Sequence, residues 1–382
     1  MSDNSRAEVI VDLAAIDANI KRLMKQSGKP ALAVVKADAY GHGLVPVARA
    51  AMKAGAEWLG TALLEEALLL REAGIRAKVI AWLTPTTDDL SAAIIHDIDL
   101  AIPSREHLHV VVEAGKRATR KPRVHLEIDT GMSRGGALIE WNQLLVDAAN
   151  AQSAGLIEVI GIWSHFARAD EPGHSLNTEQ RQRFVAALAE AKKLGINPKI
   201  AHLSNSAATI NDADSHFDLV RLGIAMYGLS PDVKTMGSSQ KLNLIPAMSI
   251  RARVHLVKDV PAGSQVGYGG TAITKSDTKL AVIAMGYADG IPRNASSEAG
   301  VLIGNKMSPI IGRVSMDQFV VDLGSESQAR AGDWAYLIGS PKRDSYTSAN
   351  CYTADSWAAA CGTINYEIVT RISPRVARVY LD

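Results

Sequence analysis

One segment of the sequence places a lysine directly after a short apolar run and just before two glycines. It reads Ala33-Val-Val-Lys36-Ala-Asp-Ala-Tyr40-Gly-His-Gly43. Such a lysine could simply extend its stem along a strand and hold its ammonium in water. In a desolvating pocket the same amine could form a Schiff base with a carbonyl cofactor. The glycines would let the backbone approach a ligand, and the Tyr40 hydroxyl could donate to a phosphate oxygen.

Further candidate site residues follow later apolar runs, namely Arg134, His165, Asn205, Ser206, Arg221, Gly223 and Ile224. Backbone N–H groups at Gly223 and Ile224, with Ser206 at the start of a short predicted helix, could bind a phosphate. Arg221 beside that phosphate could face the pyridine nitrogen of a pyridoxal ring. Each residue also has an ordinary interpretation, as a turn glycine, a surface ion pair or a core histidine.

A second candidate for proton transfer is Tyr268, which lies between glycines in Val266-Gly-Tyr268-Gly-Gly270. A hairpin with a buried tyrosine would explain the glycines, whereas a catalytic phenol would need a neighbouring cation or histidine. The sequence contains no HxxxH or CxxC spacing, so we expect no metal site. Its two cysteines are too few for a disulfide scaffold, which favours a reducing compartment, the cytoplasm.

The composition narrows the class of partner. With 382 residues, of which 47% are hydrophobic, the chain is long enough for two or three folding units. The 41 Lys and Arg against 40 Asp and Glu leave no basic surplus for nucleic-acid phosphates. The start is polar and no apolar run is long enough for a membrane span, so we expect neither a signal peptide nor a membrane partner. A small-molecule partner fits best.

The elements that must position these residues alternate between apolar runs and amphipathic segments. Eight runs have the character of buried strands, at 31–35, 58–62, 78–83, 98–102, 123–128, 159–163, 198–203 and 217–220. Helical segments between them imply parallel pairing, because a parallel return needs a crossover. Eight such units predict a closed (β/α)8 barrel, with its active site at the C-terminal ends of the strands. A doubly wound open sheet is the rival, but no GxGxxG opens the first unit.

The pattern changes near residue 240. Apolar and polar residues alternate from Ile250 to Val257, which indicates a half-buried antiparallel strand. We expect further strands at 280–285, 301–304, 309–314, 319–323, 334–338 and 376–381, and one helix at 354–360. The predicted organisation is therefore a barrel over residues 1–240 and a mainly β domain over residues 241–382.

Together these residues resemble the alanine racemases, a family of fold-type III pyridoxal phosphate enzymes that join a barrel to a β domain and act as homodimers. The most specific likeness is the Ala33–Gly43 segment, which resembles the family's cofactor-lysine signature almost letter for letter. Further motifs follow in the family's order over nearly the whole chain: Asp129-Thr-Gly-Met132 with Arg134, His202-Leu-Ser-Asn-Ser206, Arg221–Gly228, Val266–Gly269, Gly286–Gly290, Gly312–Asp317 and Gly362–Glu367.

The resemblance implies interconversion of L- and D-alanine with pyridoxal 5'-phosphate, which supplies D-alanine for peptidoglycan. Lys36 would hold the cofactor and act as the base on the D side. Tyr268 of the partner subunit would be the base on the L side. Two bases suit racemisation, because one proton leaves one face of a planar carbanion while another arrives at the opposite face.

The resemblance also implies binding roles. Arg134 and the backbone of Met316 would bind the substrate carboxylate, and His165 would lie against the ring and link Tyr268 to Arg221. The residues implied to bind the cofactor phosphate, or to lie beside those that do, are Tyr40, Asn205, Ser206, Gly223, Ile224 and Tyr366. The implied supporting residues are Glu127, Asp317 and, in the entrance corridor, Tyr287 and Arg293.

Two positions depart from the family pattern. Where the family usually has a lysine that is often carbamylated, two residues before Asp129, this chain has Glu127. A carbamate is an anion that braces the carboxylate-binding arginine, so we predict that Glu127 supports Arg134, directly or through water or an ion. The family's frequent cysteine before Met316 is Ser315 here, which puts sensitivity to thiol reagents in doubt and leaves racemisation unaffected.

Three alternatives remain at this point. A racemase of broader scope and a decarboxylase of basic amino acids could use the same kind of barrel, although such decarboxylases lack the Tyr268 and Arg134 arrangement. A pyridoxal phosphate carrier would be a lone barrel with a similar lysine and no counterpart to the β domain. The sequence leaves the preference between alanine and serine open.

Overall fold

The computed structural model describes residues 5–341 and 350–382. These form two compact units. The barrel unit contains residues 15–39 and 44–245. The sheet unit contains the described residues up to Ala14, Tyr40–Gly43, and the described residues from Pro246 onward.

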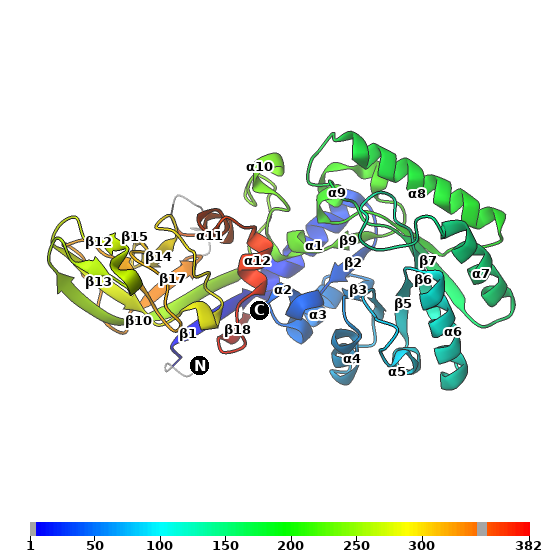
Figure 1. The fold of residues 1–382 in the computed structure, drawn as a ribbon, viewed down its shortest axis with the longest axis horizontal. Helices are drawn as coiled ribbons and strands as arrows, with labels where there is room; N and C mark the ends of the chain where they lie inside the picture. The colour runs from blue at the N-terminus through cyan, green and yellow to red at the C-terminus, as the bar shows by residue number, and fades with distance from the viewer. Residues whose placement is uncertain (1–4, 342–349) are drawn as a thin grey trace. The chain divides into compact units, whose positions relative to one another are not determined.

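The barrel unit is built on eight parallel strands that lie in one sheet (Figure 1). They are β2 (Ala31–Val34), β3 (Trp58–Thr61), β4 (Lys78–Ala81), β5 (Ile98–Ile102), β6 (Arg123–Glu127), β7 (Glu158–Trp163), β8 (Ile200–His202) and β9 (Val220–Leu222). Strands β2 to β8 are neighbours in chain order, and β9 returns to pair with β2. Hydrogen bonds from Asp218 N to Ala201 O and from Arg221 N to Ser204 O bridge the remaining gap. The predicted eight-stranded parallel barrel is confirmed.

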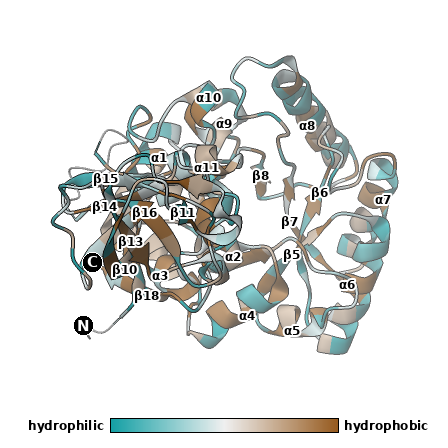
Figure 2. Ribbon diagram, turned by 60° about the vertical axis from the view of Figure 1, so that its left-hand side comes forward, coloured by the Kyte–Doolittle hydropathy of each residue, from teal (hydrophilic) through white to brown (hydrophobic). Residues whose placement is uncertain are grey.

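One helix precedes the first barrel strand, and helices follow most of the others, as the crossovers between parallel strands require. They are α1 (Leu13–Ser27), α3 (Leu44–Lys53), α4 (Leu64–Glu72), α5 (Leu90–Ile95), α6 (Arg105–Ala118), α7 (Trp141–Ser153), α8 (Ser175–Lys193), α9 (Ser206–Asn211) and α10 (Val233–Met236), with short 3-10 turns η1 (Ala213–Ser215) and η2 (Ile224–Tyr227). Helices α4, α6 and α8 carry both hydrophilic and hydrophobic colours in Figure 2, as expected of helices with one face on a core.

The sheet unit is mainly antiparallel, as predicted. Its large sheet runs in the order β15-β14-β17-β10-β1-β18, with β13 on β10 and β16 on β13. The strands are β1 (Ala7–Asp12), β10 (Met248–Val260), β13 (Thr278–Ile283), β14 (Gly300–Ile303), β15 (Lys306–Pro309), β16 (Phe319–Asp322), β17 (Trp334–Ile338) and β18 (Ala377–Leu381). A separate hairpin joins β11 (Gln265–Val266) to β12 (Ala272–Ile273) around η3 (Tyr268–Gly270). The other elements are η4 (Tyr287–Asp289), α11 (Ala354–Cys361) and α12 (Asn365–Thr370).

Three details differ from the sequence-based expectation. Strand β1 pairs with β10 and β18, so the first residues belong to the sheet unit and not to the barrel side of a boundary at residue 240. The strand expected at 309–314 is wrong: β15 ends at Pro309, and Gly312, with a φ of +78°, turns the chain beyond it. Arg221 lies inside β9 instead of following the last strand.

Candidate active site

The segment after β2 has an unusual backbone that carries Lys36. The turn labelled α2 (Lys36–Tyr40) is left-handed, with φ values of 54°, 52°, 53° and 53° from Ala37 to Tyr40. For residues with a Cβ this conformation costs roughly 1–2 kcal/mol each, so the surrounding structure must impose it. Its cost is borne at the strand end where a barrel places its chemistry.

Two carboxylates brace this left-handed turn within the barrel unit. Glu66 accepts hydrogen bonds from Ala37 N at 2.5 Å and, with its other oxygen, from Ala62 N and Leu63 N at 3.0 and 3.1 Å. Asp38 accepts from the N–H of Leu44, at the start of α3, at 2.8 Å. The turn is thereby tied to α3 and α4.

Lys36 is one of three cations in electrostatic reach of His165. Burial, together with Lys36, Arg134 and Arg221, holds the pKa of His165 well below its ordinary value, so the imidazole is neutral at neutral pH. Burial first, and then Arg134, lower the pKa of Lys36, while Glu66 raises it. The Lys36 ammonium lies 6.0 Å from the centre of the Trp82 ring. Three of the predicted site residues thus gather around a fourth.

Arg221 is buried in the barrel and donates to several acceptors. Its Nη2 contacts Ser164 O at 2.9 Å, Leu203 O at 3.0 Å and His165 Nδ1 at 3.2 Å. Its Nη1 contacts His202 O at 2.9 Å and His202 Nδ1 at 3.3 Å. No carboxylate within 4 Å pairs with it in the described part of the chain. Burial lowers the pKa of Arg221 to about 9, so it remains charged at neutral pH.

The residues expected at the phosphate lie together after β8 and β9. Ser206 is buried, and its Oγ accepts hydrogen bonds from Gly223 N at 2.9 Å and Ala225 N at 3.3 Å. Asn205 caps α9 by accepting from Ala208 N at 3.1 Å. Ile224 is buried directly after Gly223. The hydroxyl and the backbone therefore already form one polar unit at this strand end.

Glu127 is the last residue of β6, and its side chain lies close to Gly135, next to Arg134. The side chain is buried, and its Oε1 lies 3.0 Å from where a Cβ on Gly135 would be. Burial raises the pKa of Glu127 to about 7, while Arg221 and Arg134 act to lower it. Among the described residues no ion pair within 4 Å joins Glu127 to Arg134. The support of Arg134 by Glu127 therefore stays a prediction, and it would act over a longer distance or through a bridging water or ion.

Several site residues of the sheet unit are also brought together. The rings of Tyr40 and Tyr366, both expected at the phosphate, have centres 6.2 Å apart. The backbone of Met316 accepts from Ala288 N at 2.9 Å, which ties it to the Tyr287 segment. Asp317 forms an ion pair with Arg375 at 2.8 Å, which links the segment after Met316 to the segment before β18.

Tyr268 lies in the β11–β12 hairpin, where Gly267, Gly269 and Gly270 all have positive φ. In the single chain its side chain is 69% exposed, so the alternative of a buried hairpin tyrosine is wrong. Arg293 lines a cavity of about 430 Å³ beside β12.

Metal-binding clusters and membrane-spanning helices are both absent from the described residues. Within residues 5–341 and 350–382, no group of three or more His, Cys, Asp or Glu side chains is placed to hold a metal ion. In the same residues no helix is both long and apolar enough to cross a membrane.

Comparison with known proteins gives the family. The model of the alanine racemase N-terminal domain matches residues 11–231, and that of the alanine racemase C-terminal domain matches residues 247–380. The chain belongs to the alanine racemase family. It is accordingly an isomerase, an amino-acid racemase.

Similar alanine racemases span the whole chain. A relative from Salinispora tropica is 50% identical over 377 residues, which cover 98% of each chain. A crystal structure from Streptomyces lavendulae has a TM-score of 0.95 at 47% identity and covers 99% of this chain and 97% of that one. A structure from Bacillus anthracis, described with bound L-Ala-P, has a TM-score of 0.88 at 36% identity, with coverages of 99% and 95%.

Sequence reasoning missed the residues that shape these alanine racemase loops. Glu66 carries no motif signal, because its partners are backbone N–H groups. Gln180 is buried in α8 and donates to Thr130 Oγ1 at 3.2 Å and His165 O at 3.0 Å, which joins the loops after β6 and β7. A glutamine on the core face of a predicted helix was the only available signal.

The bracing of the left-handed turn can be tested by Glu66→Gln. An amide NH2 cannot accept hydrogen bonds, so at least one N–H of Ala37, Ala62 or Leu63 loses its acceptor and the others keep only a neutral one, at a cost of about 2 kcal/mol. We expect a lower free energy of unfolding in urea titrations. Glu65→Gln is the matched control, because Glu65 is exposed. Equal stability of the two variants would contradict the bracing role.

The buried carboxyl of Glu127 predicts a pH-dependent contribution to stability. Its pKa rises from 4.5 in the unfolded chain to about 7 in the folded one, so folding favours the protonated form. The associated stability is complete below pH 4.5 and is lost as the pH rises through 7, and the shift corresponds to roughly 3 kcal/mol.

Glu127→Gln removes this titration. We expect the variant to gain stability relative to the parent protein as the pH rises from about 5 to about 8, as measured by thermal unfolding of the cofactor-free protein. A difference between the two proteins that stays constant over this range would show that Glu127 does not titrate there.

Proposed function

We propose that this chain binds pyridoxal 5'-phosphate through Lys36 and interconverts L- and D-alanine by a two-base mechanism. One observation carries the proposal: a partly buried lysine at the end of a barrel strand lies, together with Arg134 and Arg221, within electrostatic reach of His165. This surplus of positive charge suits a ligand set with a phosphate and a carboxylate. The relative from Bacillus anthracis, solved with L-Ala-P, supports an alanine-derived ligand.

The residues present fit this cofactor. Lys36 offers an amine whose protonated form is disfavoured by burial, and the Ser206 hydroxyl and the Ile224 N–H offer hydrogen-bond donors for a phosphate, to which the Gly223 N–H would turn from Ser206 Oγ. Tyr40 and Tyr366 would contribute their hydroxyls to the same phosphate. When bound, pyridoxal phosphate withdraws electrons from the substrate α-carbon and makes its proton acidic.

Lys36 would move the proton on the D side. Burial and Arg134 lower the pKa of its amine, which increases the fraction of neutral amine that can accept a proton near neutral pH. Arg134 has a second task, because its guanidinium can bind the substrate carboxylate and so orient the α-carbon. Glu127, an anion above pH 7, would keep Arg134 oriented for that contact.

Tyr268 of a second copy of the chain would move the proton on the L side. Its exposure in the single chain supports a role completed by another subunit, and hence a homodimer. Because a guanidinium only donates, the contact with Arg221 requires an unprotonated Nδ1 on His165, which leaves the proton on Nε2. That N–H can then donate to the Tyr268 phenol oxygen.

Arg221 would face the pyridine nitrogen of the cofactor. Since it remains a cation at neutral pH, it would donate a hydrogen bond without transferring a proton, so the ring stays neutral and withdraws electrons less strongly. We further propose that the enzyme acts in the cytoplasm and supplies D-alanine for peptidoglycan.

Lys36→Ala tests the cofactor assignment. We expect the visible absorbance band of lysine-bound pyridoxal phosphate and the racemase activity, followed by circular dichroism of L-alanine, to disappear together. Lys53→Ala, at an exposed lysine of α3, should keep both. A Lys36→Ala protein that kept either property would refute the assignment, and a parent protein with the band but no racemisation would be a carrier.

Tyr268→Phe tests the division between the two bases. The variant should keep the absorbance band, because the cofactor lysine is unchanged, and should slow proton exchange mainly from the L side, by about 100-fold or more. Exchange is measured with alanine labelled at Cα in each configuration. Equal losses from both sides would argue against one base on each face.

A further inference from the structure

A buried chain of polar contacts leads away from Arg221 through the barrel interior. Arg221 Nη1 lies 3.3 Å from His202 Nδ1, and His202 Nε2 lies 3.0 Å from His125 Nδ1. His125 Nε2 lies 3.2 Å from Asp99 Oδ2. The side chains come from β9, β8, β6 and β5. We call Arg221, His202, His125 and Asp99 the polar relay.

Every member of the polar relay is shielded from water. The exposed fractions are 4% for Arg221, 1% for His202, and 0% for both His125 and Asp99. A buried polar group without a partner costs about 1–3 kcal/mol, so each proton in the relay must point at an acceptor. The partners along the polar relay therefore determine which atom donates in each hydrogen bond.

The two ends of the polar relay fix the direction of its hydrogen bonds. Arg221 can only donate, so His202 Nδ1 must be unprotonated and its proton must be on Nε2. That N–H donates to His125 Nδ1, which places the His125 proton on Nε2, from where it is donated to Asp99 Oδ2. Burial, Arg221 and His125 hold the pKa of His202 well below its ordinary value, in keeping with a neutral ring.

Aromatic rings and a glycine hold the imidazoles in place. The Trp163 ring stacks on His202 at 5.8 Å with an interplanar angle of 8°, and Trp58 meets His125 edge-on at 5.3 Å. A Cβ on Gly161 in β7 would lie 2.4 Å from His125 Nδ1, so only glycine leaves room for this ring. The backbone thus reserves space for the His125–His202 contact.

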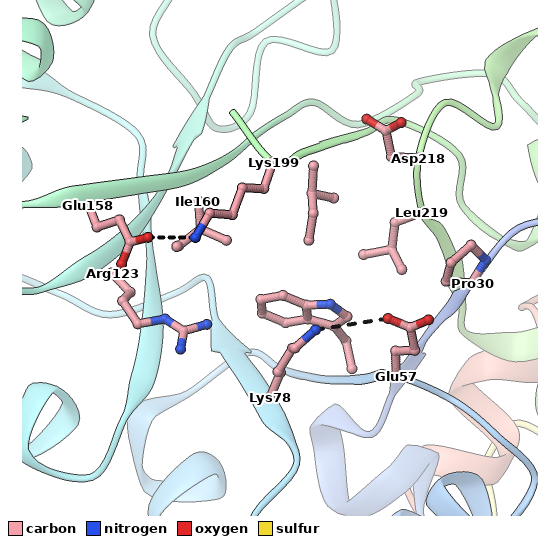
Figure 3. A pocket seen from close by; sticks show the side chains of 11 residues that line it. Pro30, Glu57, Lys78, Arg123, Glu158, Ile160, Lys199, Asp218 and Leu219 are labelled. Carbon is pink, nitrogen blue, oxygen red and sulfur yellow. Dashed lines mark hydrogen bonds and ion pairs between the residues drawn. The ribbon is translucent and has the colours of Figure 1, made fainter. Parts of the chain in front are cut away.

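The far end of the polar relay reaches the opposite mouth of the barrel. Arg123, at the start of β6, forms an ion pair with Asp99, with Nε 2.9 Å from Oδ1. It lines a cavity of about 470 Å³ with Glu158, Lys199, Lys78 and other residues from the beginnings of the strands (Figure 3). Arg123 thereby gives the Asp99 side chain a cationic partner, in keeping with its place as the acceptor at this end of the polar relay.

We propose that Asp99 and His125 are positioning residues for the racemase reaction: through His202 they keep an imidazole lone pair facing Arg221 and so fix the guanidinium. The consequence for catalysis rests on the proposed function, because Arg221 is there the group that would face the cofactor ring. With the opposite tautomers, an N–H of His202 would face an N–H of Arg221, and the guanidinium would have to move.

The direction of the hydrogen bonds is measurable in the cofactor-free protein. With 15N-labelled histidine, NMR correlations between ring nitrogens and carbon-bound protons distinguish the tautomers, and His202→Gln and His125→Gln identify the two rings by loss of signal. We expect both rings to be neutral with the proton on Nε2. A proton on Nδ1 of His202 would overturn the inference. Neutron diffraction of the parent protein reads the same protons if a variant does not fold.

Asp99→Asn tests the transmission along the polar relay. We expect the His202 ring signals to shift although Asp99 does not contact His202, and kcat to fall at least about 10-fold while KM for alanine stays within about twofold. Glu158→Gln is the control, because it breaks an ion pair with Lys199 at the same barrel mouth without touching a histidine. Unchanged His202 signals in Asp99→Asn would refute the inference.

The two proposals can fail separately. If pyridoxal phosphate does not bind the parent protein, the proposed function is wrong, while the histidine signals of the cofactor-free protein still decide the hydrogen-bond direction. If the cofactor binds and alanine is racemised, but Asp99→Asn keeps the parent kcat, the positioning role is wrong and the proposed function stands.

Discussion

The arrangement of the barrel interior depends on one buried cation, the guanidinium of Arg221. A charge removed from water needs hydrogen-bond acceptors close to it, and here no carboxylate is in ion-pair distance within the described chain. The acceptors are instead the carbonyls of Ser164, His202 and Leu203 and two imidazole nitrogens. Because these carbonyls lie at the end of β8 and in the segments directly after β7 and β8, satisfying Arg221 also fixes the starts of the loops that carry the candidate site.

The same constraint sets the electrostatics around it. Three cations share the surroundings of His165, and Glu127 is the nearby anion that acts on both Arg134 and Arg221. Arg221 is buried, Lys36 is partly buried and Arg134 is exposed, and the mutual repulsion of these cations costs stability that an anionic ligand offsets when it binds. Their placement at the C-terminal ends of the strands agrees with the general position of active sites in parallel barrels. The left-handed turn after Lys36 is a second locally unfavourable feature, and it lies directly beside the candidate cofactor lysine.

The sheet unit contributes in a different way. Its antiparallel strands hold short segments with exposed side chains, among them Tyr268 and Met316. On the proposed function, Tyr268 would act in the site of a second copy of the chain. The physical chemistry of the barrel explains what Lys36, Arg134 and Arg221 can do.

The sequence by itself determined the parallel barrel, the mainly β domain and most of the candidate site residues. Apolar runs separated by amphipathic segments allow few other folds, and the polar residues just after those runs must gather at one end of a parallel barrel. Lys36, Arg134, His165 and Arg221 were identified in this way.

Only the tertiary structure decided which side chains support them. Glu66 binds backbone N–H groups, and Asp99 and His125 contact side chains from other strands, so none of the three has a local sequence pattern. Strand β1 could not be assigned to its sheet, because its partners lie more than two hundred residues away. Periodicity reports burial along one element, whereas hydrogen-bond partners across elements exist only after the chain has folded.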